Sequence, residues 1–166
     1  MLTQAQLKEY LHYNPETGIF TWIKNPRNKN NIGGVAGTLH NPHKKDGYLQ
    51  IKLHGYLILS HRLAWLYMTG NMPTHQIDHI NGIKYDNKFS NLRECNNSQN
   101  HMNLGLRSNN KSGYKGVCYN KANKKWTAQC KFNGVYKFLG NYETPELASK
   151  AYVEYAKKEC GEFFKY

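Results

Sequence analysis

The sequence predicts an α+β fold in two modules. Its 166 residues suffice for one ordinary domain or two small ones. Short helix and strand patterns are mixed through the N-terminal part, whereas from Ser112 onward three strand patterns are followed by one helix pattern. We therefore expect a first module over residues 1–106, a linker over 107–111, and a second module over 112–166. The second module is expected to be a small three-stranded antiparallel sheet packed on one helix.

The first elements predicted are a short helix and a strand joined by a turn. Thr3 is a suitable helix N-cap, and apolar residues recur at helical spacing over residues 2–12. Residues 14–18 have the composition of a turn, and residues 19–22 have that of a strand. Residues 24–47 are rich in Asn, Lys and Gly, which predicts a loop with short strand pieces.

A hairpin and a buried helix are predicted next. Residues 47–53 alternate between outward and inward positions, His54-Gly55 turns the chain, and residues 56–59 form the second strand. Residues 60–69 carry apolar side chains at helical spacing and are followed by Gly70, a residue that commonly ends helices. These residues therefore predict a buried helix.

The second module has a clear local pattern. Residues 114–119, 125–132 and 136–140 alternate as strands, and Asn133-Gly134 is a two-residue hairpin turn between the second and third. Thr144 and Pro145 begin a helix that ends at a glycine. Its apolar stripe recurs at helical spacing, at Leu147, Ala148, Ala151, Tyr152, Tyr155 and Ala156.

The charge of the chain indicates the kind of partner it binds. Lys and Arg number 23 against 11 Asp and Glu, which gives a net charge of +12, and 13% of the residues are aromatic. So many aromatic side chains argue against a disordered basic tail. A basic, aromatic domain most often binds an anionic polymer, with nucleic acid as the default. A basic housekeeping domain is the alternative that composition leaves open.

Membrane and secreted proteins are classes that the sequence argues against. No apolar run approaches the ~20 residues of a membrane span, and the N-terminus lacks the pattern of a secretory signal. We therefore expect no membrane partner and a cytoplasmic location. Four cysteines occur without a C-x-x-C pair, so zinc has no support in the sequence, and free thiols are favoured over disulfides.

Polar side chains with catalytic chemistry are densest between residues 78 and 103. Residues 73–93 predict a short strand, a long polar loop and a second short strand, and residues 94–104 are compatible with a helix. Asp78 beside His79 offers a hard oxygen ligand and a proton acceptor, and an Asn on the helix offers a second oxygen for Mg²⁺. A neutral His with a pKa near ~6.5 can take a proton from water. This combination indicates phosphodiester hydrolysis.

Several motifs occur in the order of a known family: Ser60-His61-Arg62-Leu63-Ala64-Trp65, Ile77-Asp78-His79-Ile80-Asn81-Gly82, Asp86-Asn87, Asn91-Leu92-Arg93-Glu94 and Ser98-Gln99-Asn100. Together they resemble the HNH endonucleases, specifically the phage and intron homing branch. The opening of the chain, from Tyr13 to Trp22, also resembles that of the phage proteins. The resemblance covers residues 1–104.

This resemblance implies a ββα-metal fold, in which two strands and a helix surround one divalent ion. By position, His79 matches the general base that activates the attacking water, and Asp78 and Asn100 match the metal ligands. Asn91 matches the Asn that holds the loop and the base in place. The expected ion is Mg²⁺, with Mn²⁺ as the alternative and zinc not expected. The resemblance also implies a bacterial or phage-infected host cell.

Other polar residues of this region have a structural interpretation beside the functional one. Arg93 is a candidate DNA contact, but for Arg93 and His61 a role in bracing the fold is favoured over a phosphate contact. Asp86-Asn87 is expected to shape the loop rather than to bind metal, and His75 is expected to be exposed.

Lysines dominate the strands of the second module. Six lysines and no acidic residue lie between Ser112 and Gly140, which argues against an ordinary solvated face. A cationic, aromatic-studded sheet can enter the major groove of DNA, with lysines on phosphates and other side chains on base edges. Strand alternation is expected to bring Trp126 close to Gln129 and Lys131. The candidate DNA contacts are Lys115, Lys124, Lys125, Trp126, Gln129, Lys131 and Lys137.

This stretch resembles the plant ethylene-response-factor (APETALA-type) DNA-binding domain. The motifs that carry the resemblance are Tyr114-Lys115-Gly116-Val117, Lys125-Trp126, Phe138-Leu139-Gly140 and Ala151-Tyr152. It implies a sheet in the major groove with the helix packed behind it. Lys115 stands where an Arg usually reads guanine, and Cys118 replaces another Arg, so affinity for DNA is more strongly indicated than sequence-specific readout.

The function predicted from these features is a metal-dependent HNH endonuclease that cleaves double-stranded DNA, with a monomer favoured. A homing role follows from the resemblance. One alternative is a catalytically silent DNA-binding protein on an HNH scaffold, which the presence of Asp78, His79 and Asn100 disfavours. Another is an RNA-binding protein whose aromatic sheet stacks on bases.

Overall fold

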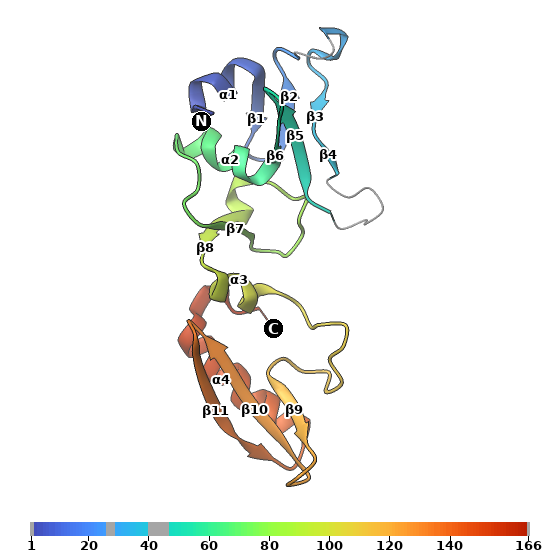
Figure 1. Ribbon diagram of the computed structural model, residues 1–166, viewed down its shortest axis with the longest axis vertical. Helices are drawn as coiled ribbons and strands as arrows, with labels where there is room; N and C mark the ends of the chain where they lie inside the picture. The colour runs from blue at the N-terminus through green and yellow to red at the C-terminus, as the bar shows by residue number, and fades with distance from the viewer. Residues whose placement is uncertain (1, 26–28, 40–46, 166) are drawn as a thin grey trace. The chain divides into compact units, whose positions relative to one another are not determined.

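The computed structural model describes residues 2–25, 29–39 and 47–165. The chain divides into two compact units, Met1–Cys95 and Asn96–Tyr166 (Figure 1). Helices and small antiparallel sheets are mixed in the chain, as the sequence predicts. Of the loop predicted over residues 24–47, residues 26–28 and 40–46 lie outside the described part.

The first unit contains short helices and strands. In chain order they are α1 (Gln4–Tyr10), β1 (Leu11–Asn14), β2 (Ile19–Trp22), η1 (Lys29–Asn31), β3 (Val35–Ala36), β4 (Thr38–Leu39), β5 (Leu49–Leu53), β6 (Tyr56–Leu59), α2 (Ser60–Thr69), β7 (Gln76–His79), η2 (Phe89–Asn91) and β8 (Leu92–Cys95). The strands form three sheets, with the orders β1-β2-β3, β4-β5-β6 and β7-β8.

The first helix is shorter than the apolar pattern over residues 2–12 predicts. Thr3 caps α1 through a capping box with Gln6, as its position predicts, but the helix ends at Tyr10. Leu11 and Tyr13 are buried, whereas His12 and Asn14 are exposed, so the residues after Tyr10 have the alternation of a strand. They pair with β2 instead of extending the helix.

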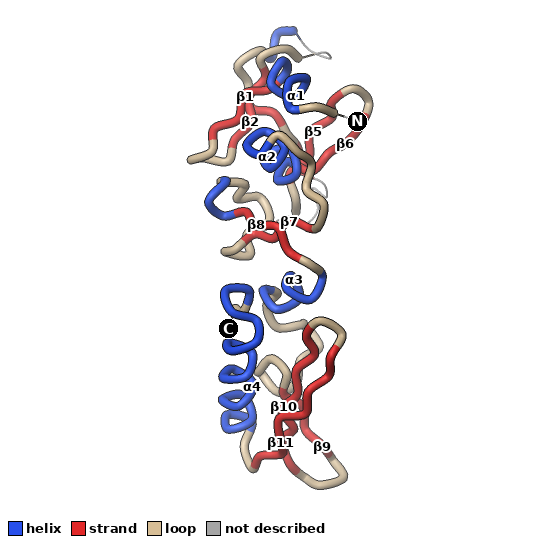
Figure 2. The backbone as a smooth tube through the Cα atoms, turned by 90° about the vertical axis from the view of Figure 1, so that its left-hand side faces the viewer, coloured by secondary structure: helices blue, strands red, loops and turns tan. Residues whose placement is uncertain are grey.

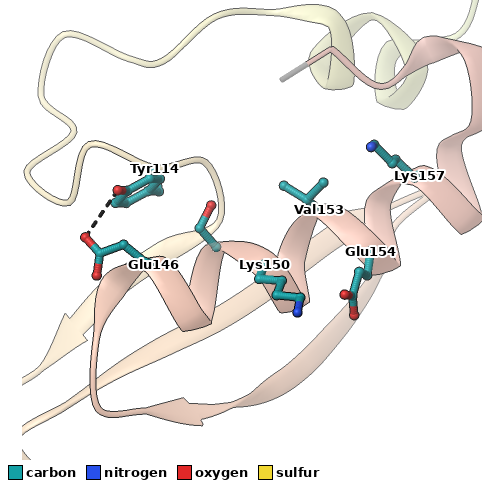
Figure 3. A pocket seen from close by; sticks show the side chains of 7 residues that line it. Tyr114, Glu146, Lys150, Val153, Glu154 and Lys157 are labelled. Atoms are coloured by element: carbon teal, nitrogen blue, oxygen red, sulfur yellow. Dashed lines mark hydrogen bonds between the residues drawn. The ribbon is translucent and has the colours of Figure 1, made fainter.

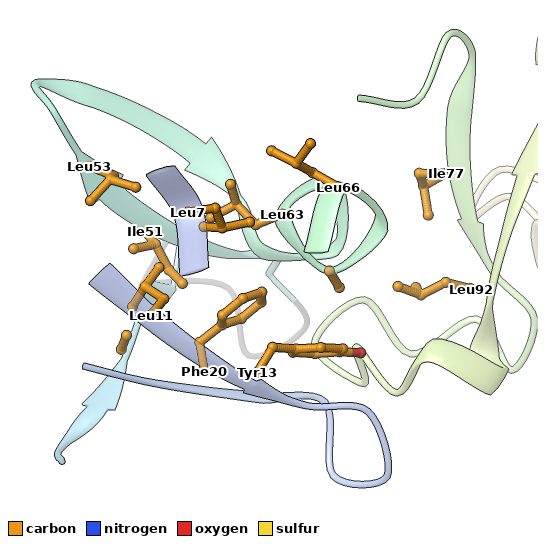
Figure 4. Close-up of a cluster of buried hydrophobic side chains, with 12 residues drawn as sticks. Leu7, Leu11, Tyr13, Phe20, Ile51, Leu53, Leu63, Leu66, Ile77 and Leu92 are labelled. Atoms are coloured by element: carbon orange, nitrogen blue, oxygen red, sulfur yellow. The ribbon is translucent and has the colours of Figure 1, made fainter. Parts of the chain in front are cut away.

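One apolar core holds the first unit together. Leu7, Phe20, Ile51 and Leu63 are almost completely buried and converge from α1, β2, β5 and α2 (Figure 4). Ile77 of β7 and Leu92 of β8 belong to the same core. The β7–β8 hairpin, which carries Asp78 and His79, is therefore anchored to the rest of the unit by apolar packing.

The β1–β2 turn lies directly against the loop that follows β7. A Cβ atom on Gly18 would lie 2.5 Å from the backbone carbon of Asn87, so the close approach requires glycine. The Tyr13 hydroxyl donates to the backbone oxygen of Asn87 at 2.6 Å, and the amide of Phe89 donates to the backbone oxygen of Pro15 at 3.1 Å. The N-terminal hairpin thus holds the loop between β7 and β8 in place.

The second unit contains α3 (Asn97–Asn103), β9 (Val117–Asn120), β10 (Lys125–Phe132), β11 (Val135–Tyr142), α4 (Pro145–Cys160) and η3 (Gly161–Phe163). Its sheet has the order β11-β10-β9 and is antiparallel throughout, and α4 lies along one face of it (Figure 2). Ala128 and Cys130 of β10 pack against Ala148, Tyr152 and Ala156 of α4. The predicted three-stranded sheet with one helix is confirmed.

The boundary between the units lies before the predicted linker. Residues 107–111 were expected to separate the modules, whereas the compact units divide between Cys95 and Asn96. Met102 of α3 is buried in the core of the second unit, and the backbone amide of Asn133 donates to the Ser98 hydroxyl at 3.1 Å. Since these contacts are long-range in sequence, helix periodicity does not reveal them.

Candidate active site

Asp78 and His79 form the end of β7 and are both buried. In the antiparallel pairing with β8, Asp78 lies opposite Arg93 and His79 lies opposite Leu92. The exposed fractions of Asp78 and His79 are only 5% and 4%. A buried carboxylate and a buried imidazole are costly unless other groups satisfy them, so the partners of each define the site.

The imidazole of His79 is oriented by Asn87. His79 Nε2 lies 3.0 Å from Oδ1 of Asn87, and because an amide oxygen only accepts, this contact is a hydrogen bond in the tautomer that carries the proton on Nε2. Asn87 is itself almost completely buried and is held through its backbone oxygen by Tyr13. Burial lowers the pKa of His79, while the Asn87 hydrogen bond and the nearby carboxylates oppose this shift. The ring is therefore neutral at pH 7, which is the form that accepts a proton.

Asn87 is a site residue that sequence reasoning missed. The sequence predicts that the Asp86-Asn87 pair shapes the loop rather than binds metal. Its position next to an Asp marks turn chemistry, and nothing in the local pattern indicates that its side chain turns back to His79 across eight positions.

Two further rings surround His79. The ring of His61 lies 5.1 Å from that of His79, at nearly a right angle, and Tyr48 lies 5.3 Å from His61 and 6.0 Å from His79. Burial, reinforced by the charges of His79 and Arg62, lowers the pKa of His61 to about 3. Within the described part of the chain, no hydrogen-bond partner reaches Nδ1 of His61 or Nδ2 of Asn87. His61 therefore lies against His79 as a neutral ring, which agrees with a bracing role.

Asp78 forms a buried ion pair with Arg93. Nε and Nη2 of Arg93 both donate to Oδ2 of Asp78, at 3.0 and 2.9 Å. The pair crosses the β7–β8 ladder, so the strand register places the two charges together. The guanidinium was expected either to contact phosphate or to brace the fold, and in this structure it braces Asp78.

Asp78 carries the kind of oxygen ligand that Mg²⁺ takes. This ion takes hard oxygen ligands, uses one or two protein carboxylates, and keeps waters and phosphate oxygens as its remaining ligands. Among the described residues, no three His, Cys, Asp or Glu side chains form a group that could hold a metal ion. The carboxylate of Asp78 could hold such an ion, and its Oδ2 is also the acceptor of the Arg93 hydrogen bonds.

Asn91 is tied to the loop rather than to His79 itself. Its Oδ1 accepts from the backbone amide of Asn81 at 2.9 Å, and its Nδ2 donates to Oδ1 of Asn81 at 3.0 Å and to the backbone oxygen of Asp86 at 2.7 Å. These bonds close the loop that begins directly after His79. The other proposed metal ligand, Asn100, lies on α3 in the second unit, so only Asp78, His79 and Asn91 are brought together in one unit.

The lysine-rich sheet has two distinct faces, and three of the candidate DNA contacts do not lie on its outer face. Trp126 packs with Val117 and Ala128 on the side of α4, which is the opposite face from Gln129. Lys137 is paired with the buried Cys130 and so also belongs to the α4 side. Lys115 donates to the backbone oxygens of Met102 and Lys165. The expectation that Trp126 lies close to Gln129 and Lys131 on one face is corrected accordingly.

The outer face of this sheet carries the remaining candidates. Lys125, Gln129 and Lys131 take alternate positions on the face of β10 opposite to Ala128 and Cys130, the face that also holds the buried Thr127. Tyr136 and Phe138 of β11 lie opposite Lys131 and Gln129, and both are more than half exposed. Lys124 lies in the turn before β10, with a positive φ of 52°.

A pocket in the second unit contains none of the residues that the sequence singled out for chemistry. It runs along α4 and is lined by both acidic and basic side chains, among them Glu146, Lys150 and Glu154 (Figure 3). The Tyr114 hydroxyl donates to Oε1 of Glu146 at 3.2 Å across one end of it. These contacts are those of a solvated helix surface.

Comparison with known proteins bears on one segment of the chain. No curated protein and no solved structure matches the chain. A family model described as HNH endonuclease matches residues 59–102. The matched segment runs from the end of β6 through α2, β7 and β8 to Met102, and it contains His61, Asp78, His79 and Asn87. This match supports the placement of the segment that carries the candidate active site in the HNH nuclease family.

Proposed function

We propose that this chain is a metal-dependent endonuclease that hydrolyses phosphodiester bonds of double-stranded DNA. The observation that carries the proposal is the geometry at the end of β7. A buried, neutral His79 is held through Nε2 by Asn87, and the Asp78 carboxylate is its neighbour in the chain. The HNH family match over the same residues supports a nuclease acting on DNA.

The chemistry assigned to His79 is general-base catalysis. With Nε2 donating to Asn87, the lone pair on Nδ1 is the group that takes a proton from the attacking water. The imidazolium formed in this step gains stability from Asn87 and from the carboxylates of Asp78 and Asp86, which all favour the charged ring.

Asp78 is proposed as a ligand of Mg²⁺, with Mn²⁺ as the alternative. The Arg93 ion pair holds the Asp78 carboxylate in a fixed position, so the ligand is oriented before the ion binds. When bound, a divalent ion polarises the scissile phosphate and stabilises the leaving 3′ oxygen.

We propose further that the outer face of the β9–β11 sheet targets the enzyme to DNA through Lys125, Gln129 and Lys131. The resemblance to ethylene-response-factor domains supports this role, as does the net charge of +12. Trp126, Lys115 and Lys137 are left out because of where the structure places them. Resemblance to the phage and intron enzymes supports a homing role.

Incubation of supercoiled plasmid with the protein tests the proposal. We expect nicked or linear product with Mg²⁺ and none with a chelator present. His79→Ala should abolish cleavage and leave DNA affinity nearly unchanged, because the base contacts a water rather than the backbone of the duplex. His75→Ala is the matched control, since His75 is exposed and lies outside the site.

Each outcome of this experiment has a distinct meaning. Cleavage by His79→Ala at the wild-type rate would show that another group is the base. Tight DNA binding without cleavage by the wild-type chain, in Mg²⁺ and in Mn²⁺, would favour the alternative of a catalytically silent DNA-binding protein.

A further inference from the structure

The loop over residues 80–88, which follows His79, exposes several large apolar side chains. Three large apolar side chains point outward: Ile80, Ile83 and Tyr85 are 42%, 41% and 52% exposed. Polar side chains of the same loop are bonded to one another, among them the exposed Asn81 and the half-buried Asp86. Exposed apolar side chains that gather in one loop mark a candidate contact surface.

The loop is held rigidly by hydrogen bonds. Nδ2 of Asn81 donates to Oδ2 of Asp86 at 2.7 Å, and Oδ1 of Asn81 accepts from the amide of Ile83 at 2.8 Å and from Nδ2 of Asn91 at 3.0 Å. The backbone amide of Gly82 donates to the carbonyl oxygen of His79 at 2.7 Å, and the amide of Asp86 donates to the carbonyl oxygen of Ile83 at 3.1 Å. The apolar side chains are therefore held outward by a braced backbone.

Cations accompany these apolar side chains next to the base. Nζ of Lys84 lies 5.7 Å from the centre of the Tyr48 ring, and that ring lies 6.0 Å from the ring of His79. Lys88 is exposed at the far end of the loop. The one acidic side chain of the loop, Asp86, is engaged by Asn81. The outward face thus combines apolar tips with positive charge beside the proposed general base.

We infer that the 80–88 loop is a DNA wedge: Ile83 and Tyr85 enter the minor groove and part a base step near the scissile phosphate, while Lys84 contacts the backbone. Proteins that distort DNA in this way insert apolar side chains between base steps and flank them with Lys or Arg. A duplex suits this face better than a protein partner, because the apolar side chains are few, are separated by Lys84, and belong to a strongly basic chain. The inference rests on the proposed function, since it assigns the substrate contact of the same site.

Unwinding of DNA tests the wedge without cleavage. Relaxed plasmid is incubated with the full-length protein, a topoisomerase that needs no metal, and a chelator that prevents hydrolysis. A wedge that parts base steps unwinds the duplex, so the recovered plasmid should carry negative supercoils in proportion to the protein bound. The double variant Ile83→Ser/Tyr85→Ser should lose this change and still bind DNA.

The matched control is Ile23→Ser/Tyr56→Ser, which removes an isoleucine 43% exposed and a tyrosine 73% exposed from elsewhere in the same unit. This control should unwind plasmid as the wild type does. Unwinding that persists in the Ile83/Tyr85 variant, or wild-type protein that binds and cuts plasmid without unwinding it, would overturn the wedge and leave the proposed nuclease intact. Wild-type protein that neither binds nor cuts DNA would overturn both.

Discussion

At the scale of single residues, the candidate site is unusual in the amount of polar chemistry it buries. His61, Asp78, His79 and Asn87 are all nearly inaccessible to water, and among the described residues two of their polar atoms lack a partner. Such orphaned atoms each cost about 1–3 kcal/mol. Natural proteins retain costs of this kind mainly at functional sites, which agrees with a catalytic role for this cluster.

The low pKa of His61 predicts an acid-sensitive first unit. The unfolded chain takes up a proton at this residue near the ordinary pKa of 6.5, whereas the folded protein does not until about pH 3. Stability is therefore fully present above pH 6.5 and falls as the pH decreases between these values, by about 1.4 kcal/mol per pH unit. Between pH 7 and pH 5 the wild type should lose about 2 kcal/mol more than His61→Phe.

Native-state hydrogen exchange at the buried amides of Leu63 and Leu66 in α2 measures this difference, because it reports the opening of the first unit alone. His79, also of lowered pKa, is present in both proteins and does not enter the comparison. An equal loss of stability in the wild type and in His61→Phe would show that His61 titrates normally.

At the scale of elements, the sheet and helix of the second unit are joined at a point of very close approach. A Cβ atom on Gly116 would lie 2.2 Å from the Tyr152 ring and 2.6 Å from the backbone oxygen of Gln129, and the φ angle of Gly116 is +67°. The start of β9 therefore packs onto α4 only because residue 116 has no side chain.

Gly116→Ala should destabilise the second unit by about 3 kcal/mol, since it combines overpacking with a left-handed backbone. Gly134→Ala is the control: Gly134 has a φ of +80° but open space around it, so the cost should be about 1 kcal/mol. A urea titration that follows the amide resonances of β10 gives both values. Equal costs would mean that the contact with Tyr152 relaxes without penalty.

At the scale of the whole molecule, the chain carries a large positive charge distributed over two compact units. Among the described residues, no helix has the length and apolar character needed to cross a membrane. The outer face of the β9–β11 sheet presents its lysines with exposed aromatic side chains, and the opposite face is covered by α4. Binding of DNA through this sheet should therefore depend on the face from which a lysine projects.

Lys131→Gln should flatten the slope of log affinity against log salt by about 0.9, which corresponds to the loss of one phosphate contact. Lys137→Gln removes the same charge from the α4 side of the same sheet and should leave the slope unchanged. Titrations of duplex DNA at several salt concentrations, without divalent ions, measure both. Equal flattening would show that charge alone matters, and no change in either would remove this sheet from the DNA interface.

Local sequence patterns were sufficient to predict much of the fold. The three strands and the helix of the second unit, the β5–β6 hairpin and α2 all follow from periodicity and turn residues, which act over a few neighbouring positions. The adjacent positions of Asp78 and His79 at the end of a strand could likewise be predicted from the sequence, because two consecutive residues need no tertiary contact to lie together.

Contacts between distant positions required the folded chain. The side chain of Asn87 bonds to His79 in a loop that packs against the β1–β2 turn. Arg93 lies beside Asp78 because of the register of β7 and β8. The placement of Trp126 on the α4 side and of α3 in the second unit also depends on packing partners far away in sequence. Periodicity records which side of an element is apolar, whereas the partner that covers that side is selected by closure of the chain and by the shape of the core.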